Sequence, residues 1–356
     1  MTAAQRVEAL ASLAHEDDPR VRKSVAIALG SLGVSEATPA LCELLADADE
    51  GVRVLACQAL GRVADPAAVP ALLGRVHDAS VEVRSGVLFA LASVVAHSGI
   101  AEEARAELFT PMVVMAFDPD DGVRADAAAT LGTLRDDRAV EPLTLLAEDS
   151  CAQVRANACA SLGLSDDAGA LDVLLACAEN VGEAPLVRIA ALDGLARRAE
   201  RGMLPAGAPE AMRAVALACA LAEGAACNSG GAAVSGDSGF DSRATEAEAN
   251  ERLVGDTADS EGDARTPTAA DLRATAAWAL GMIPAGAARD RVQAALEAAL
   301  ACEDVWCQRY AIEALARIGD DAARAVLRRL DDERAADSRA LAPEVASVLE
   351  QTLALL

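Results

Sequence analysis

The sequence predicts an all-α protein, a right-handed α-α superhelical solenoid of about eight helix pairs with a capping helix at each end. Three observations support this fold class: Val-Arg pairs recur, a Leu follows each Arg after seven residues, and the pairs are regularly spaced. The pairs begin at Val21, Val52, Val83, Val123, Val154 and Val187, with degenerate copies at Leu272-Arg273 and at Gln308. The steps are 31, 31, 40, 31, 33, 85 and 35 residues, a period typical of stacked repeats.

The first helix of each pair is predicted from the residues around the repeated Arg. An Asp stands four residues before it at Asp18, Asp49, Asp120 and Asp304, where a carboxylate can cap free backbone N–H groups. Apolar or small residues follow three, four and seven places later, as in Val25, Ala26 and Leu29, and form one face of a helix. Next to the Leu stands a small residue, which predicts close approach of a neighbouring backbone; examples are Gly30, Gly61, Gly132, Gly163 and Gly281.

A Leu-rich second helix follows in each pair. We expect it to begin near a cap residue, at Ser35, Asp65, Asp137, Asp167 and Asp321. An extended second helix over residues 102–117 explains the long step between Arg84 and Arg124. Residues 3–14 and 344–356 lack a complete unit and are predicted to cap the two ends.

One segment interrupts the repeat pattern. Residues 224–268 are rich in Gly, Ser, Asp and Glu with almost no apolar run, which predicts a disordered acidic insert. Removing it shortens the 85-residue step to the length of the earlier long step. We therefore expect N-terminal repeats over residues 1–223, and C-terminal repeats with a capping helix over residues 269–356 that continue the same solenoid.

The order of these features, Asp before Val-Arg, then an Ala-rich helix ending in Leu-Gly, then a Leu-rich helix, resembles the HEAT repeat. The form it resembles is the phycobilisome-lyase HEAT-like repeat, over nearly the whole chain. The resemblance implies that Asp18, Asp49, Asp120 and Asp304 and the Arg series form a ladder linking successive repeats. It also implies that the second helices form the inner layer of the array.

Composition excludes several functions. The net charge is −25 and Lys23 is the single lysine, so a basic stripe for nucleic acid is missing. Aromatic residues make up 2% of the chain, too few for stacking platforms on single strands. No apolar stretch reaches the roughly 20 residues needed to span a bilayer, and the N-terminus lacks signal-peptide features. We expect a cytoplasmic protein that binds neither nucleic acid nor membrane.

Nine cysteines are spread along the chain without a Cys-x-x-Cys pair. Cys57 and Cys159 both stand four residues after their Arg, where other repeats hold apolar residues, and are predicted to be core residues. Cys227 lies in the predicted insert, where it is either a reactive thiol or an ordinary surface cysteine.

Two enzymatic alternatives follow from the resemblance. Deoxyhypusine hydroxylases, which are similar in architecture, bind two irons through His-Glu pairs after the Val-Arg-like position, but no such pair stands there in this chain. His15-Glu16 and His77-Asp78 share another position, but one repeat separates them, and solvated loop residues are the alternative interpretation. Phycobilin lyases attach a tetrapyrrole, and this chain has no cluster that marks a pigment pocket. We assign no catalytic residue, cofactor or metal.

A non-catalytic scaffold or adaptor that binds another protein is the favoured function, with a lyase-like or other chromophore- or metal-handling enzyme as the alternative. Acidic residues on the second helices are candidates for binding a basic segment: Glu43, Asp47, Glu141, Glu148, Asp172 and Glu179. The alternative is an acidic surface that serves solubility or salt adaptation.

Two aromatic residues near the C-terminus form a second candidate contact. Trp306 and Tyr310 stand four residues apart on one helix, at positions that are mostly polar in other repeats. Exposed Trp and Tyr are typical anchors of interfaces. The alternative is that the C-terminal helix or Phe240 covers them.

Overall fold

The computed structural model describes residues 2–97, 102–204, 208–222, 267–336 and 340–356, and every regular element in these ranges is a helix. The chain divides into two compact units, residues 1–146 and the described residues from 147 onward. This confirms the all-α solenoid class. The predicted insert, with Cys227 and Phe240, lies almost entirely outside the described residues.

The first unit contains a capping helix followed by four helix pairs. Helix α1 (Ala3–Ala11) packs on α2, and the pairs are α2 (Pro19–Leu32) with α3 (Thr38–Leu44), α4 (Glu50–Val63) with α5 (Val69–Leu73), α6 (Val81–His97) with α7 (Glu102–Met115), and α8 (Asp121–Leu134) with α9 (Val140–Leu146). Short 3-10 turns lead into three of the second helices, η1 (Ser35–Ala37), η2 (Pro66–Ala68) and η3 (Asp137–Ala139).

The second unit repeats this arrangement. Its pairs are α10 (Ala152–Leu162) with α11 (Gly169–Glu179), α12 (Pro185–Glu200) with α13 (Pro209–Ala222), α15 (Ala269–Met282) with α16 (Arg289–Leu300), and α17 (Val305–Ile318) with α18 (Asp321–Ala335). A 3-10 turn, η4 (Gly286–Ala288), leads into α16. Helix α19 (Pro343–Leu355) packs on α17 and α18. Helix α15 packs against both α12 and α13, although 46 residues separate it from α13 in the sequence.

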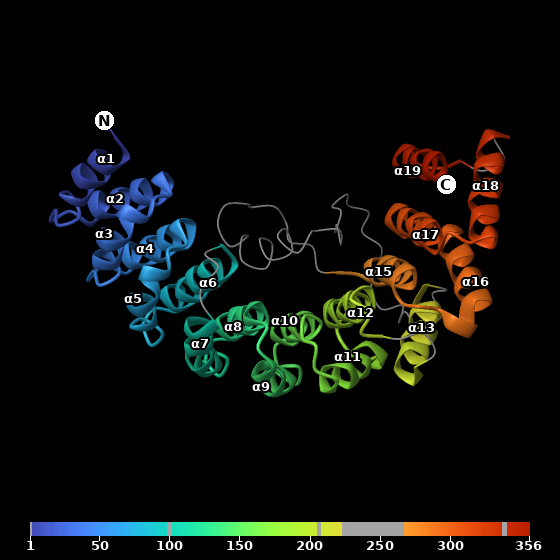
Figure 1. Ribbon diagram of the computed structural model, residues 1–356, viewed down its shortest axis with the longest axis horizontal. Coiled ribbons are helices and arrows are strands. Elements are labelled where there is room, and N and C mark those ends of the chain that lie inside the picture. The colour runs from blue at the N-terminus through green and yellow to red at the C-terminus, as the bar shows by residue number, and fades with distance from the viewer. Residues whose placement is uncertain (1, 98–101, 205–207, 223–266, 337–339) are drawn as a thin grey trace. The chain divides into compact units, whose positions relative to one another are not determined.

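Within each unit the two helices of the pairs form two layers (Figure 1). The first helices pack directly on the first helices of neighbouring repeats, as α2 on α4 and α15 on α17, whereas successive second helices contact each other far less. The layer with the closer spacing lies on the inner side of a curved stack. The expectation that the second helices form the inner layer is therefore wrong for this chain, and they lie on the outer side.

Small residues allow this close spacing of first helices. A Cβ added to Gly30 would lie 2.7 Å from the Cβ of Ala59, and one added to Gly281 would lie 2.8 Å from the Cα of Ala314. A Cβ on Gly163 would overlap the Cα of Gly194. The predicted close approach of backbones is confirmed at these positions.

The predicted caps of the first helices are also confirmed. Each of Asp18, Asp49, Asp120 and Asp304 accepts a hydrogen bond from a backbone N–H in the first turn of its helix. The second helices differ more from the prediction. Asp65 caps η2, but the capping residues of η3 and α18 are Asp136 and Asp320, each one residue earlier than predicted. The predicted core cysteines Cys57 and Cys159 are fully buried.

Candidate functional sites

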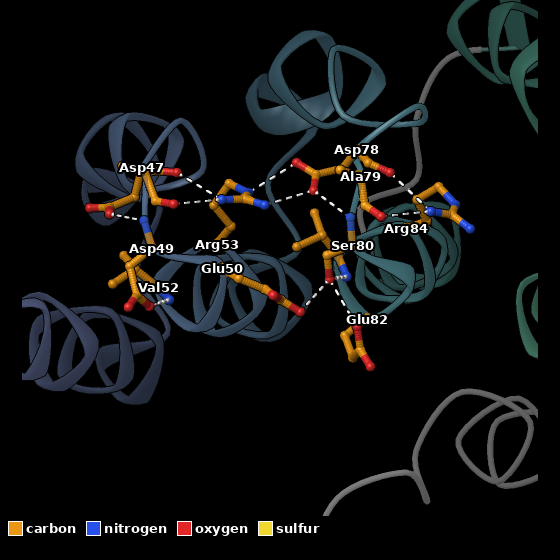
Figure 2. Close-up of polar contacts among 12 residues, drawn as sticks. Asp47, Asp49, Glu50, Val52, Arg53, Asp78, Ala79, Ser80, Glu82 and Arg84 are labelled. Carbon is orange, nitrogen blue, oxygen red and sulfur yellow. Dashed lines mark hydrogen bonds and ion pairs between the residues drawn. The ribbon is translucent and has the colours of Figure 1, made fainter.

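A ladder of arginines joins successive repeats along one edge of the stack. The Nε and Nη2 atoms of Arg53 donate to the two carboxylate oxygens of Asp78 in the next repeat, at 2.9 and 2.8 Å (Figure 2). The Nη1 atom donates to the backbone oxygens of Asp47 and Ala48, at 3.0 and 3.2 Å. Asp78 also accepts the backbone N–H of Ser80 at 3.0 Å. One guanidinium therefore fixes the turn before its own helix and the turn of the next repeat.

The same pattern recurs at three other arginines: Arg22 binds Asp47, Arg84 binds Asp118, and Arg155 binds Glu183. In every case Nη1 donates to two backbone oxygens of the turn before the helix. These paired side chains are at most 18% exposed. Bidentate pairs of this kind are among the stronger polar contacts in proteins.

The ladder is present, but its acidic partners are not the residues that the resemblance implied. Asp18 and Asp49 cap helices, and the ladder carboxylates are those of Asp47, Asp78, Asp118 and Glu183. The sequence carries a signal for the first three, because an Asp stands six residues before Arg53, Arg84 and Arg124. At Ser80, which replaces a cap Asp, the hydroxyl caps Val83 and donates to Glu50 (Figure 2).

The ladder holds its carboxylates in the charged state. The hydrogen bond from Arg22 lowers the pKa of Asp47. Burial is the largest effect on the pKa of Asp78 and Asp118 and would raise it. The hydrogen bonds from Arg53 and Arg84, the backbone N–H groups of Ser80 and Asp120 and the nearby arginine charges together outweigh burial and leave both pKa values below the usual value. These groups are structural, since their oxygens are already bound within the stack.

The acidic candidates for partner binding lie mostly in solvent. Glu43, Glu141, Glu148, Asp172 and Glu179 are exposed. His15 lies 3.5 Å from Glu43, and Arg213 binds Glu179 at 2.8 Å. Asp47 is the exception: its side chain is 9% exposed and bound by Arg22, so the expectation of an available carboxylate there is corrected.

The aromatic candidates are only partly available. Trp306 is half-buried, and the guanidinium of Arg309 lies 5.0 Å from the centre of its ring. Tyr310 lies 6.0 Å from Trp306 between ring centres but is 2% exposed. Of the two interpretations of this pair, coverage holds for Tyr310, because α17 packs against α15, α16, α18 and α19 and places this side chain in the core.

The described residues contain no group of three or more His, Cys, Asp or Glu side chains placed to hold a metal ion. His77 is exposed, and the carboxylate of its neighbour Asp78 belongs to the ladder. In the same ranges, no helix is long and apolar enough to cross a membrane.

Comparison with known proteins agrees with the repeat architecture. The model of HEAT repeats matches residues 7–92 and 110–196, and the model of the PBS lyase HEAT-like repeat matches residues 308–333. The chain belongs to the HEAT-repeat family. The PBS lyase HEAT-like match covers most of α17 and most of α18, where the ladder positions are degenerate. No curated protein matches this HEAT-repeat chain.

Several solved structures are similar to this chain, one of them with a TM-score above 0.5. YibA of Escherichia coli has a TM-score of 0.51 and 16% identity, with 88% of this chain and 92% of that chain covered. An engineered protein has a TM-score of 0.47 and 19% identity, with 99% and 88% covered. The complex of CpcE and CpcF of phycocyanin lyase from Nostoc has a TM-score of 0.38 and 21% identity, with 44% and 96% covered. At these identities the likeness concerns the fold alone.

Proposed function

We propose that this HEAT-repeat protein is a non-catalytic scaffold or adaptor that binds a basic segment of another protein. The stacked helices offer an extended surface whose exposed residues can vary without disturbing the core. The chain carries 56 Asp and Glu residues and 31 Lys and Arg residues. Several of those arginines are bound to carboxylates inside the ladder, so they offer little positive charge to a partner.

The acidic surface around α11 carries the proposal. Asp172 and Glu179 stand seven residues apart on α11, two turns along one face, and both are exposed. Glu148, which precedes α10, is exposed, and its charge is close enough to affect the pKa of Cys177 on α11. Arg213 lies against this surface, where its hydrogen bond with Glu179 and the charges of Asp172 and Glu210 raise its pKa. Three acidic residues thus face solvent beside a single arginine that an incoming Lys or Arg can replace.

The test measures the binding of a fluorescein-labelled peptide of alternating Lys and Arg by fluorescence anisotropy, in low and in high salt. An acidic peptide of equal length is the control ligand. We expect binding that weakens with salt, because the contacts are exposed charges. The triple variant Glu148→Gln, Asp172→Asn, Glu179→Gln should weaken binding roughly tenfold, since each exposed charge pair contributes a few tenths to one kcal/mol.

A matched variant distinguishes a binding surface from general acidity. Glu8→Gln, Asp121→Asn and Glu344→Gln remove the same charge at exposed positions elsewhere. This variant should bind nearly as the unchanged protein does. Equal weakening by both triple variants would mean that net charge alone attracts the peptide, as expected for a surface that serves solubility.

Trp306 supplies a second, separate contact candidate because part of its ring reaches solvent. Capture of a natural partner from the cells of origin, repeated with Trp306→Ala, tests it. Tyr310 is left unchanged in this experiment, because its removal would disturb the core. Unchanged capture by Trp306→Ala would remove this residue from the interface.

A further inference from the structure

The ladder changes its chemistry in the turn between α16 and α17. Gln308 stands at the position of the ladder arginine, and its Nε2 donates to the backbone oxygen of Cys302 at 2.7 Å. Arg53 makes the equivalent bond to the backbone oxygen of Asp47, also six residues earlier. Cys302 therefore occupies the position at which earlier repeats hold a ladder carboxylate.

The arginine of the preceding repeat lacks its usual carboxylate. In the rungs of Arg22, Arg53, Arg84 and Arg155, Nε binds the acid of the next repeat, at 2.6 Å in Arg22 and 2.8 Å in Arg84. The Nε of Arg188 instead donates to the backbone oxygen of Ala178 at 3.0 Å. The Nε of Arg273, on α15, is buried and has no hydrogen-bond partner among the described residues. Its positive charge favours the thiolate form of both Cys302 and Cys307, and it contributes to the lowered pKa of Cys302, whereas larger effects raise the pKa of Cys307. A thiolate at Cys302 would supply the anion that this rung lacks.

Cys307 provides a second thiol beside Cys302. It lies in the first turn of α17 and is fully buried, whereas Cys302 is partly exposed. The hydrogen bond from Cys307 is the largest of the effects that bring the pKa of Cys302 to about 7, helped by the backbone of Asp304 and by Arg273, and opposed by burial and the carboxylate of Asp304. The same contact raises the pKa of Cys307.

A second thiol pair in the same unit shows what is particular here. Cys159 on α10 and Cys177 on α11 also share a hydrogen bond, and Arg155 lies near them. That arginine is already bound to Glu183, at 3.1 and 2.6 Å. The two pairs therefore differ in whether the neighbouring ladder cation has a carboxylate.

We propose that Cys302 is a site of reversible oxidation by hydroperoxides, with Cys307 as the thiol that closes a disulfide. The Cys302 thiolate attacks one oxygen of hydrogen peroxide, the O–O bond breaks, and the departing hydroxide takes up a proton as water. Cys307 then attacks the sulfur of the resulting sulfenic acid, and the oxygen leaves with the Cys307 proton as a second water. Two thiols and one peroxide thus give one disulfide and two waters. This step is independent of peptide binding at α11.

Alkylation of the full-length protein tests the thiolate. With iodoacetamide and peptide mass spectrometry over a range of pH, Cys302 should react several times faster than the partly exposed Cys42 and Cys151 near neutral pH, with a midpoint at about 7. Arg273→Gln should move the midpoint upward, and Arg273→Lys should largely restore it. Glu303→Gln is the matched control, since it changes an exposed neighbour in the same turn.

Oxidation tests the disulfide. Limiting hydrogen peroxide should give a Cys302–Cys307 cross-link before any Cys159–Cys177 cross-link, and a dithiol reductant should reverse it. In Cys307→Ser, a dimedone adduct should accumulate on Cys302, whereas the control Cys177→Ser should still form the 302–307 cross-link. The proposal is overturned if Cys302 reacts no faster than Cys42, or if the unchanged protein forms no 302–307 cross-link. Because both outcomes are measured on the unchanged protein, a variant that fails to fold leaves the test intact.

Discussion

Arg53 and Asp78 form a bidentate pair between the second and third repeats, with N···O distances of 2.9 and 2.8 Å. Both side chains are largely shielded, at 13% and 5% exposure. The third donor group of Arg53 binds two backbone oxygens of its own repeat. The pair therefore connects two turns that would otherwise be joined only by packing.

Replacing Asp78 by Asn should destabilise the first unit by about 2 kcal/mol, because Arg53 would keep its charge without a carboxylate. This is less than for a fully buried pair, since solvent reaches the rim and screens the charge. Urea unfolding followed by circular dichroism measures the change. Glu43→Gln, at an exposed carboxylate beside His15, should shift stability by less than about 0.5 kcal/mol. Equal effects of the two substitutions would contradict a stabilising role of the ladder.

The ladder also predicts the pH dependence of stability. The pKa values of Asp47, Asp78, Asp118 and Glu183 are lower in the folded chain than the ordinary values of 3.8 and 4.5. Their contribution is therefore complete above the unfolded pKa and is lost as the pH falls through the lower, folded pKa. Unfolding free energy measured from neutral pH down to about pH 3 should fall, most steeply below about pH 4. In Asp78→Asn the fall should be smaller, and an identical slope would argue against this origin.

Gly163 tests the close spacing of the first helices. Gly163→Ala would place a methyl group against the Cα of Gly194 and should destabilise the second unit by about 2 kcal/mol. Gly182→Ala is the control, because its nearest neighbour, the Oδ1 of Asn180, would lie 3.5 Å away. Thermal unfolding of both variants gives the comparison. If Gly163→Ala is as stable as the control, α10 and α12 do not pack as closely as the structure shows.

Trp306 and Tyr310 should respond differently to truncation. Tyr310→Ala removes a buried ring and should cost about 3 kcal/mol or more, whereas Trp306→Ala removes a half-exposed ring and should cost less. Urea unfolding of the two single variants tests the order. A larger loss for Trp306→Ala would reverse the assignment of which ring belongs to the core.

The sequence was sufficient for features that repeat. The capping Asp18 and the apolar series beginning at Val25 follow from local hydrogen bonding and helix periodicity, and both recur often enough to be recognised. The ladder acids were not predicted, because the Asp four residues before the Arg is also acidic and recurs with the repeat, although Asp47 stands at a second recurring offset. Glu183 departs from that offset by one residue, so spacing alone could not reveal it.

Features that occur once could not be predicted in the same way. The burial of Tyr310 depends on packing at the C-terminal end of the array, where other repeats offer no comparison. Whether the second helices form the inner layer depends on the relative spacing of two layers. That spacing follows from contacts between distant residues, such as Gly30 with Ala59, rather than from a pattern along the chain.

The replacement of a ladder carboxylate by Cys302 has a mechanical consequence. Between α15 and α17, Arg273 faces a thiol where four other repeats pair the arginine with a carboxylate, and no hydrogen bond joins the Nε of Arg273 to the next repeat among the described residues. Under mechanical force, or when the array unfolds locally, the repeats after α15 should separate from the rest between α15 and α17 first. Oxidation of Cys302 to a disulfide with Cys307 would remove the thiolate that faces Arg273 and so change how readily the last repeats separate from the rest of the array.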